Sequence, residues 1–463
     1  MKVTFADKSS EDYHDEPLAS GAEGSIFRSV RGDHVIKLYK PGKMNDAERI
    51  NRIDLLINQF NPATDPYWSQ YFTWPEKRVI RPQIGFRMRY VHMKMLSHYV
   101  YSRSYSRLPA EERGWFIGKV AAAIKLAAAA QRLSFMGLCY PDFSEKNVLV
   151  EPFAGRMVLI DCDSLCIPTR LSATVEGANW YRAPEIVMGT KLPSVLSDRH
   201  ALAAVLYRWL LLWHPLIGDK QFDLDPAKDD ELRFGQRALY VEHPNDPSNR
   251  ATKQVFTSRV LGPPLERLFR RAFVDGLHAP EKRPQPYEWQ QALIATYDRL
   301  LPCASADCDW HFYVALPPSG FTCPRCRQRL KYPKTVPLVY LHQHRHRAGP
   351  EGYDIHETDA HFVVGWQGRP LYLWHTRSDA TATYTNPAHP PDTSPCAMFE
   401  YDRQAQVWSL TNLTLPEMRY RAAGGEWRPC PPRTSIQLAT GVEIQFGNAA
   451  QHFRASVTLE RVG

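Results

Sequence analysis

The sequence predicts an α+β protein with several domains, and three observations support that fold class. Its 463 residues exceed what a single hydrophobic core usually serves, so two or three domains are expected. Strand-type runs fill residues 12–95, with one helical pattern at 45–59, whereas residues 110–300 are mostly helical in pattern. Residues 355–463 carry short strand-type runs broken by Pro, Gly and Asn, which predicts a small β-sandwich.

The composition is that of a globular protein, with 44% hydrophobic and 23% charged residues. The net charge of +8 is spread along the chain, which indicates a solvated surface and does not favour nucleic acid as a partner. The N-terminus lacks an apolar segment of signal-peptide length, and the most apolar stretches, 120–130 and 201–212, are too short to cross a bilayer. We therefore expect a cytoplasmic protein without a membrane partner. Nine cysteines in such a chain argue against a disulfide framework.

Five short segments carry the functional signal. Residues 21–27 read Gly-Ala-Glu-Gly-Ser-Ile-Phe, and residues 35–39 read Val-Ile-Lys-Leu-Tyr. Further along, residues 142–147 read Asp-Phe-Ser-Glu-Lys-Asn, residues 159–163 read Leu-Ile-Asp-Cys-Asp, and residues 183–185 read Ala-Pro-Glu. Each segment alone is common, but in this order and at these intervals they resemble the nucleotide site of a protein kinase.

The resemblance implies a bilobal protein-kinase-like fold over residues 12–300. The small β-rich lobe would cover about 12–92 and the larger helical lobe about 93–300. The expected activity is ATP- and Mg²⁺-dependent transfer of the γ-phosphoryl group to serine or threonine of a protein. A nucleotide-binding pseudokinase that acts as a scaffold is the alternative, and a small-molecule phosphotransferase is a third reading.

In the small lobe, the resemblance assigns a glycine turn to the phosphates, because glycine lets the backbone approach without a Cβ in the way. Lys37 would neutralise phosphate charge, and Glu48 or Asp54 would orient that lysine; the sequence does not decide between the two acids. Met88 and Tyr90 would lie beside the nucleotide near the hinge. The residues of the turn are Gly21, Ala22, Glu23, Gly24 and Ser25.

In the large lobe, the resemblance assigns three polar residues to the chemistry. Asp142 would orient the acceptor hydroxyl and receive its proton, while Asn147 and Asp161 would hold Mg²⁺. The step of fourteen residues between Asn147 and Asp161 suits a hairpin that brings both to one ion. Asp198 matches the aspartate that holds the catalytic-loop backbone in kinases, and Arg283 matches the arginine that pairs with the glutamate of Ala-Pro-Glu.

The pattern is similar to a divergent subgroup of bacterial Ser/Thr kinases. Those kinases have Trp-Pro near the hinge, as at residues 74–75, and Asp-x-Asp-Ser where others have Asp-Phe-Gly, as at 161–164. They also occur beside a phosphatase and a von Willebrand factor A protein in tellurite-resistance-associated gene sets. These two proteins and a protein substrate are the expected partners.

Several positions depart from the usual kinase pattern. Ala19 replaces the first glycine of the loop, and Tyr140-Pro141 replaces the usual His-Arg before the catalytic aspartate. Ser144 stands in place of the lysine that usually touches the transferring phosphoryl group. These departures reduce the expected turnover but leave Lys37 and the three acidic and amide groups in place.

Two cysteine pairs within residues 301–332 indicate a zinc ribbon. One pair has four residues between its members, the other has Pro-Arg, and fourteen residues separate the pairs; a site of this kind is tetrahedral. We expect Zn²⁺ to have a structural role, because zinc can supply about 10–16 kcal/mol to the folding of such a module. Residues 333–354, rich in Pro, His and Arg, are expected to be a linker. The expected ligands are Cys303, Cys308, Cys323 and Cys326.

The tail resembles a forkhead-associated domain in the order of its strand-type runs. Where such domains place the arginine and histidine of the phosphothreonine site, this chain has Trp366 and Cys396. A degenerate module that packs against a protein partner is therefore expected. Arg369 and Arg377 leave phosphothreonine binding open.

Overall fold

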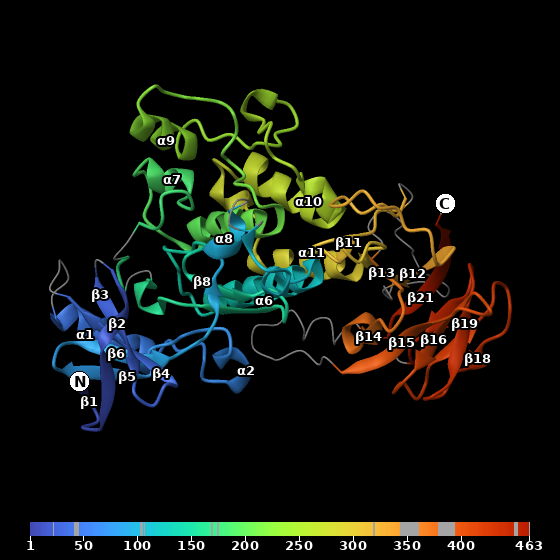
Figure 1. Cartoon of the computed structure of the whole chain (residues 1–463), viewed down its shortest axis with the longest axis horizontal. Helices are drawn as coiled ribbons and strands as arrows, with labels where there is room; N and C mark the ends of the chain where they lie inside the picture. The colour runs from blue at the N-terminus through green and yellow to red at the C-terminus, as the bar shows by residue number, and fades with distance from the viewer. Residues whose placement is uncertain are drawn as a thin grey trace, which may run out of the picture. The chain divides into compact units, whose positions relative to one another are not determined.

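The chain forms two compact units that both combine helices with sheets (Figure 1), which confirms the mixed α+β class. The first unit comprises Met1–Arg113, Lys125–Thr257 and Phe269–Pro286, and the second comprises Gly114–Ile124, Ser258–Leu268 and Tyr287–Gly463. The computed structural model describes residues 1–21, 23–40, 46–101, 105, 107–167, 170–173, 176–317, 320–342, 361–377, 394–448 and 452–462.

The first unit begins with a closed barrel of six antiparallel strands in the order β1-β2-β3-β4-β6-β5. Val3 and Phe5 of the first strand are buried in its interior, so this part starts at β1 and not at residue 12 as expected. The strands are β1 (Lys2–Phe5), β2 (Ser10–Ser20), β3 (Gly24–Ser29), β4 (His34–Tyr39), β5 (Lys77–Arg81) and β6 (Gly85–Arg89).

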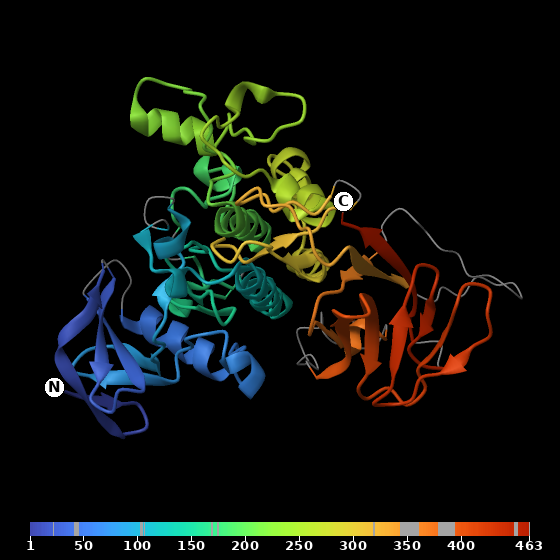
Figure 2. The ribbon, with the colours of Figure 1, turned by 45° about the vertical axis from the view of Figure 1, so that its right-hand side comes forward.

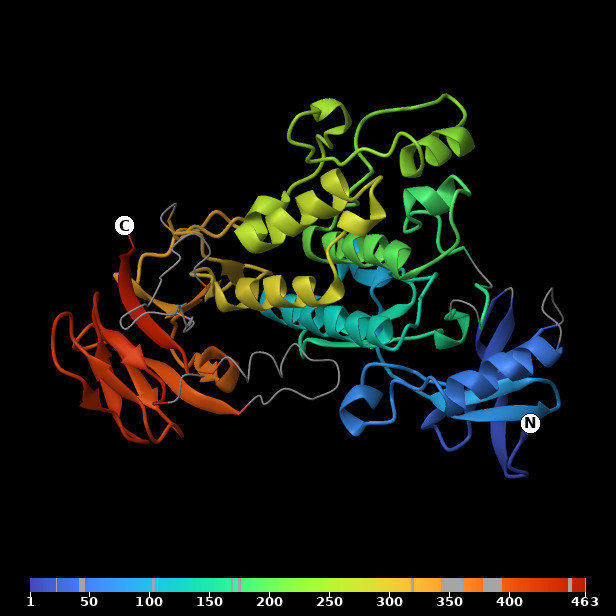
Figure 3. The ribbon, with the colours of Figure 1, turned by 180° about the vertical axis from the view of Figure 1, so that it is seen from behind.

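Helix α1 (Asp46–Asn58) packs against the outside of this barrel (Figure 3). Two acidic residues lie in its first turn, where their negative charge interacts favourably with the positive end of the helix dipole. Ile53 is fully buried against barrel side chains that include Val35, Phe86 and Met88. The alternation of β4 therefore buries one set of side chains in the barrel and the other set under α1.

Helices dominate the rest of the first unit. Helix α8 (Val195–Leu211) starts with a capping box in which the side chains of Ser194 and Ser197 satisfy backbone N–H groups. Strands β7 (Lys94–Met95), β8 (Val148–Glu151) and β9 (Arg156–Leu159) form a small sheet. Within the described residues, no helix combines the length and the apolar character needed to cross a bilayer. The other helices before residue 271 are α2 (Pro66–Ser69), α3 (Ser97–Val100), α5 (Ala110–Arg113), α6 (Phe116–Phe135), α7 (Pro184–Val187), α9 (Pro226–Phe234) and α10 (Pro263–Arg270), of which α6 and α10 belong partly to the second unit.

The second unit contains a β-sandwich, drawn in orange and red in Figure 2. Its six-stranded sheet has the order β13-β12-β21-β20-β17-β18, and its four-stranded sheet has the order β14-β15-β16-β19. One apolar core takes side chains from both sheets, including Val339, Phe399 and Val457. The strands are β12 (Thr335–His342), β13 (His361–Val364), β14 (Pro370–Tyr372), β15 (Pro395–Asp402), β16 (Val407–Asn412), β17 (Arg419–Arg421), β18 (Arg428–Pro429), β19 (Ser435–Leu438), β20 (Glu443–Gln445) and β21 (Arg454–Arg461).

The expected linker at 333–354 is wrong for its first part. Thr335–His342 is strand β12, which pairs along its whole length with β21 and also with β13. Val336, Leu338 and Val339 are almost fully buried, because this run is apolar enough to enter the core. The sandwich therefore begins before residue 355. The remainder of the expected linker, 343–354, lies outside the described residues.

The second unit also contains helix α11 (Pro286–Asp298), followed by the hairpin of β10 (Leu300–Pro302) and β11 (Phe312–Val314). The hairpin is antiparallel, with Leu301 opposite Tyr313. It carries the first cysteine pair, which lies within the expected zinc-ribbon segment 301–332.

Candidate functional site

Lys37 is the centre of a buried charge cluster in the first unit. The residue sits on β4, between β3 and β6, and only 5% of it is exposed. Its Nζ donates to Asp161 Oδ1 at 2.6 Å and to both carboxylate oxygens of Asp163 at 2.9 Å. Burial favours the neutral amine, but the charges of Asp163 and Asp161 outweigh it and raise the pKa of Lys37. The lysine is therefore a fixed cation.

The two aspartates share that one cation in a tight turn after β9. Asp161 has a left-handed backbone (φ 58°), and its carbonyl oxygen accepts from Ser164 Oγ at 3.0 Å. Burial raises the pKa of Asp161 to about 6, and the neighbouring charge of Asp163 adds to this rise while Lys37 opposes it. Burial would also raise the pKa of Asp163, but Lys37 and the hydroxyl of Tyr39, 2.5 Å away, lower it. Asp163 is therefore the acid that forms the more stable ion pair with Lys37.

Asp142 and Asn147 are joined within one loop. Asn147 Nδ2 donates to the backbone carbonyl of Asp142 at 2.9 Å and to its Oδ2 at 2.6 Å. Burial raises the pKa of Asp142, and the bond from Asn147 opposes that rise. The loop leads into the expected hairpin, in which β8 and β9 pair and the Ile160 amide donates to the Asn147 carbonyl at 3.0 Å. Asn147 and Asp161 thus lie at the same end of the hairpin.

Asp198 on α8 anchors the segment before Asp142. Its Oδ2 accepts from the backbone N–H of Tyr140 at 2.7 Å, and its Oδ1 accepts from Cys139 Sγ at 3.2 Å. Burial raises the pKa of Asp198 to about 7. The hydroxyl of Tyr140 donates to the carbonyl of Ile160, which links this segment to the one that carries Asp161. The carboxylate of Asp198 therefore anchors the backbone of this segment.

A second buried ion pair connects Ala-Pro-Glu to a distant arginine. Arg283 Nη1 and Nη2 each donate to one carboxylate oxygen of Glu185 at 2.7 Å. The guanidinium also donates to three backbone carbonyls, those of Gly276, Leu277 and Leu196. A buried ion pair is favourable only when its remaining hydrogen-bonding atoms are satisfied, and this one meets that condition.

The glycine turn has a structural reason that the sequence did not reveal. A Cβ on Gly24 would lie 2.6 Å from the carbonyl oxygen of Leu38, so pairing with β4 already requires glycine there. The amide of Gly21 donates to the carbonyl of Gly24 at 2.9 Å, and Ser25 Oγ is 3.0 Å from Ser20 Oγ. Glu23 is exposed. Ala22 lies outside the described residues.

The structure does not bring the expected helical acid to Lys37. Asp54 accepts from Arg78 Nε at 2.8 Å, and Glu48 is exposed in the first turn of α1. Asp161 and Asp163 are the ion-pair partners of Lys37 instead. Alternate residues of a strand share a face, so the sequence could have indicated that Tyr39 lies on the same side of β4 as Lys37.

Met88 and Tyr90 lie at and just beyond the end of β6. Met88 is buried in the apolar cluster beneath α1 and packs as a core residue. Tyr90 lies beneath Arg28, whose guanidinium carbon is 4.7 Å from the centre of the tyrosine ring. Neither position has a polar contact with the Lys37 cluster among the interactions of the described residues.

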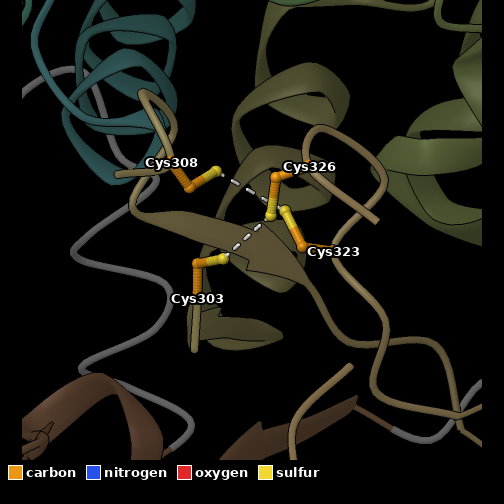
Figure 4. Close-up of side chains that lie close together, drawn as sticks. All are labelled: Cys303, Cys308, Cys323 and Cys326. Carbon is orange, nitrogen blue, oxygen red and sulfur yellow. Dashed lines mark hydrogen bonds between the residues drawn. The ribbon is translucent and has the colours of Figure 1, made fainter. Parts of the chain in front are cut away.

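The four predicted cysteines meet in the second unit (Figure 4). Their sulfur atoms all lie within 4.8 Å of one another, with Cys303 and Cys326 3.5 Å apart and Cys308 and Cys323 3.8 Å apart. Tetrahedral zinc with Zn–S bonds of about 2.3 Å needs sulfurs roughly 3.8 Å apart. The four sulfurs therefore lie close enough together to hold a metal ion.

Arg369 is not available to an external phosphate. It is 2% exposed, and its guanidinium donates to Asp298 Oδ1 at 3.0 Å and to the carbonyl of Leu300 at 3.2 Å. Asp298 also accepts from His361 at 2.6 Å and from His375 at 3.0 Å. Burial would raise the pKa of Asp298, but the two histidines lower it. Arg369, one of the two arginines that left phosphothreonine binding open, therefore has an internal role; the other, Arg377, forms a backbone bridge with His452. Cys396, whose thiol donates to the carbonyl of Leu371, is a core residue.

Comparison with models of known protein families finds no match, and comparison with curated protein sequences finds none either. One buried cation is shared by two carboxylates, and the Asp142–Asn147 pair lies at the same end of the β8–β9 hairpin as Asp161.

Proposed function

We propose that the protein is an ATP- and Mg²⁺-dependent Ser/Thr protein kinase. The observation that carries the proposal is the convergence of Lys37, Asp161 and Asp163 in one buried cluster, although 124 residues separate Lys37 from Asp161. In this proposal the barrel with α1 acts as the small lobe, and the helical remainder of the first unit acts as the large lobe. ATP is the phosphoryl donor.

The residues of the site suit Mg²⁺, which prefers oxygen ligands. Asn147 directs its amide nitrogen to Asp142, so its carbonyl oxygen is the atom left to bind a cation. Asp161 shares a single lysine with Asp163, so the pair carries one more negative charge than the lysine balances. Asn147 and Asp161 would hold the ion, and the ion would supply positive charge to neutralise the phosphates.

The chain's own groups then divide the work of phosphoryl transfer. Lys37 supplies a permanent positive charge toward the phosphates, because Asp163, which also accepts from the Tyr39 hydroxyl, fixes its position. Asp142, held by Asn147, accepts the proton of the attacking hydroxyl. Its pKa is raised by burial, which makes the carboxylate a better proton acceptor than an exposed aspartate.

Two features favour a protein over a small molecule as the substrate. The Glu185–Arg283 pair and the Asp198 anchor match elements that support a protein-binding platform in protein kinases. A phosphatase or a von Willebrand factor A protein, if one is encoded beside this chain, would be the partner to test first. These two partners are proposed from the resemblance in the sequence.

The decisive experiment is transfer of radiolabelled phosphate from ATP to generic and neighbouring-gene proteins. Asp142→Asn should abolish transfer yet leave Mg-ATP affinity within a few-fold, because Asp142 faces the hydroxyl and not the nucleotide. Glu76→Gln, a surface change at the Arg87 pair, serves as the control that keeps full activity. Full phosphorylation by the Asp142→Asn protein would remove the catalytic assignment.

A nucleotide-binding pseudokinase scaffold is the second candidate. It is favoured by the closed Lys37–Asp161 contact, in which the lysine occupies the proposed metal ligand, and by Ser144 at the position of the usual phosphate-contacting lysine. The pseudokinase predicts binding of ATP with no transfer to any partner. The kinase predicts that Mg-ATP separates Lys37 from Asp161 and that label reaches a protein hydroxyl.

The cysteine cluster is proposed to bind one structural Zn²⁺. Cys323→Ser leaves three thiolates, so we expect loss of the metal and local unfolding of residues 301–332, while transfer by the first unit survives. Metal analysis and limited proteolysis give the answer, with Cys430→Ser, a buried cysteine of the sandwich, as the matched control. Freshly purified protein without zinc would contradict this assignment.

The sandwich is proposed to be a degenerate forkhead-associated-like module that packs against a protein partner. The internal use of Arg369 supports this over a working phosphothreonine reader. Titration with phosphothreonine peptides tests the choice, and we expect no saturable binding.

A further inference from the structure

Two cysteines face each other beside the proposed catalytic loop. Cys139 and Cys166 form an antiparallel bridge in which each amide donates to the other residue's carbonyl at 2.9 Å. Such hydrogen-bonded pairs have Cα atoms about 5.5 Å apart. That separation falls inside the range of about 4.4–6.8 Å that disulfides span.

Both cysteines are buried. The structure adds their mutual placement. Cys139 lies three residues before Asp142, and Cys166 lies three residues after Asp163. A bond between them would close a loop that contains Asp142, Asn147 and Asp161.

We propose that Cys139 and Cys166 form a reversible disulfide that lowers the activity of this site. The effect on activity rests on the proposed kinase function, whereas formation of the bond does not. The oxidant is a small peroxide such as hydrogen peroxide, which two thiols reduce to two molecules of water.

The surroundings of the two thiols differ. The Cys139 thiol donates to Asp198 Oδ1 at 3.2 Å, and this bond keeps its proton in place. Arg52 donates to the carbonyl of Leu165, the residue before Cys166, and its positive charge favours the Cys166 thiolate. The thiolate is the reactive form of cysteine, so Cys166 attacks first.

The reaction balances in two steps. The Cys166 sulfur bonds to one peroxide oxygen, the O–O bond breaks, and the departing hydroxide leaves as water with the Cys166 proton. The Cys139 sulfur then displaces the remaining hydroxyl from Cys166 and forms the S–S bond. The Cys139 proton passes by way of Asp198, 3.2 Å away, to that hydroxyl, which leaves as the second water.

The bond would weaken the anchor of the catalytic loop. In the reduced protein Asp198 accepts two hydrogen bonds, one from the Cys139 thiol and one from the Tyr140 amide. In the disulfide the thiol hydrogen is gone. Of the two donors, the buried carboxylate then retains only the Tyr140 amide. Loss of one bond to a charged group is expected to lower transfer by about tenfold or more.

The test treats the full-length protein with hydrogen peroxide and measures two quantities. Mass spectrometry of a digest should find the peptides that contain Cys139 and Cys166 linked, and transfer should fall about tenfold and recover with dithiothreitol. Cys166→Ser should resist this loss. Cys162→Ser, whose thiol donates to the carbonyl of Leu159 in the same segment, should lose activity as the wild type does.

The readouts separate failure of this proposal from failure of the kinase assignment. Hydrogen exchange at the Tyr140 amide should become faster in the linked protein whether or not phosphate is transferred. No linked peptide under excess peroxide would overturn the proposal. Equal inactivation of Cys166→Ser, or unchanged exchange at Tyr140 in the linked protein, would overturn it as well.

Discussion

Each unit of this protein buries a charged cluster, and the two clusters are balanced differently. In the first unit, Asp161 and Asp163 share the single cation of Lys37. In the second unit, the lone carboxylate of Asp298 is surrounded by Arg369 and two histidines. The first cluster has surplus negative charge, whereas the second has enough positive partners to satisfy its acid.

The difference in balance appears in the carboxylates themselves. Burial raises the pKa of Asp161 to about 6, because Lys37 cannot fully serve two acids. The pKa of Asp298 falls instead, although Asp298 is more deeply buried than Asp161, because its contacts with His375 and His361 outweigh desolvation. A buried acid left short of positive charge suits a site that recruits a cation, whereas a satisfied acid suits a structural role.

The largest expected effect is the loss of activity in Asp161→Asn. Removal of a proposed metal ligand should weaken Mg-ATP binding and reduce transfer on the order of a thousandfold, about 4 kcal/mol of barrier. The fold should persist, because the change relieves a surplus negative charge next to Asp163. Steady-state kinetics and Mg-ATP titration measure both quantities.

Asp54→Asn is the matched control for that variant. Asp54 on α1 is partly exposed and pairs with Arg78, so transfer should stay within a few-fold of wild type. A loss as large as that of Asp161→Asn would restore Asp54 as the acid that serves Lys37. Wild-type rates in Asp161→Asn would instead mean that the Lys37 cluster has a structural role, as the Asp298 cluster does.

The second expected effect is the loss of stability in Asp298→Asn. The change leaves Arg369 buried without its counter-charge, which typically costs about 3–5 kcal/mol. Glu443→Gln removes a partly exposed pair with Arg421 in the same unit and should cost less than about 1 kcal/mol. Denaturant unfolding followed by hydrogen exchange in α11 and β13 measures the difference. Transfer by Asp298→Asn to a simple substrate at low temperature should remain, and its loss would mean that the second cluster serves activity too.

The same contrast explains which parts of the site could be predicted from the sequence. Lys37 on an apolar strand, the Asn147–Asp161 hairpin spacing and the paired cysteines are local patterns, and the structure brings each set together. The partner of Lys37 was expected on α1 because that expectation came from the resemblance to protein kinases. Asp163 takes that place here, since it has two carboxylate oxygens within 2.9 Å of the amine.

Other features had no local signal. The partners of Asp298 lie 63 to 77 residues further along the chain, so no spacing rule could join them. Strand β12 follows a cysteine-rich segment and precedes a polar stretch, and only its pairing with β21 more than a hundred residues away reveals it as part of the sandwich. Such long-range pairings depend on the whole core and not on neighbouring residues.

The smallest expected effect is a difference in how the two units respond to acid. The folded-state pKa of Asp298 is below its ordinary value, so its contribution to stability is present above that value and is lost as pH falls through and below it. Asp198 in the first unit is the opposite case, because burial without a cation raises its pKa to about 7. Its contribution is present below the ordinary aspartate value and declines as pH rises from about 4 to about 7.

Hydrogen exchange between pH 4 and 7 can follow each unit separately. After correction for the intrinsic pH dependence of exchange, protection around Asp198 should fall toward neutral pH, and Asp198→Asn should flatten that slope. Unfolding monitored below pH 4 should show the second unit losing stability, and Asp298→Asn should remove that loss because the titrating group is gone. Parallel pH profiles in the two units would mean that the balance of charge around these acids does not control their stability.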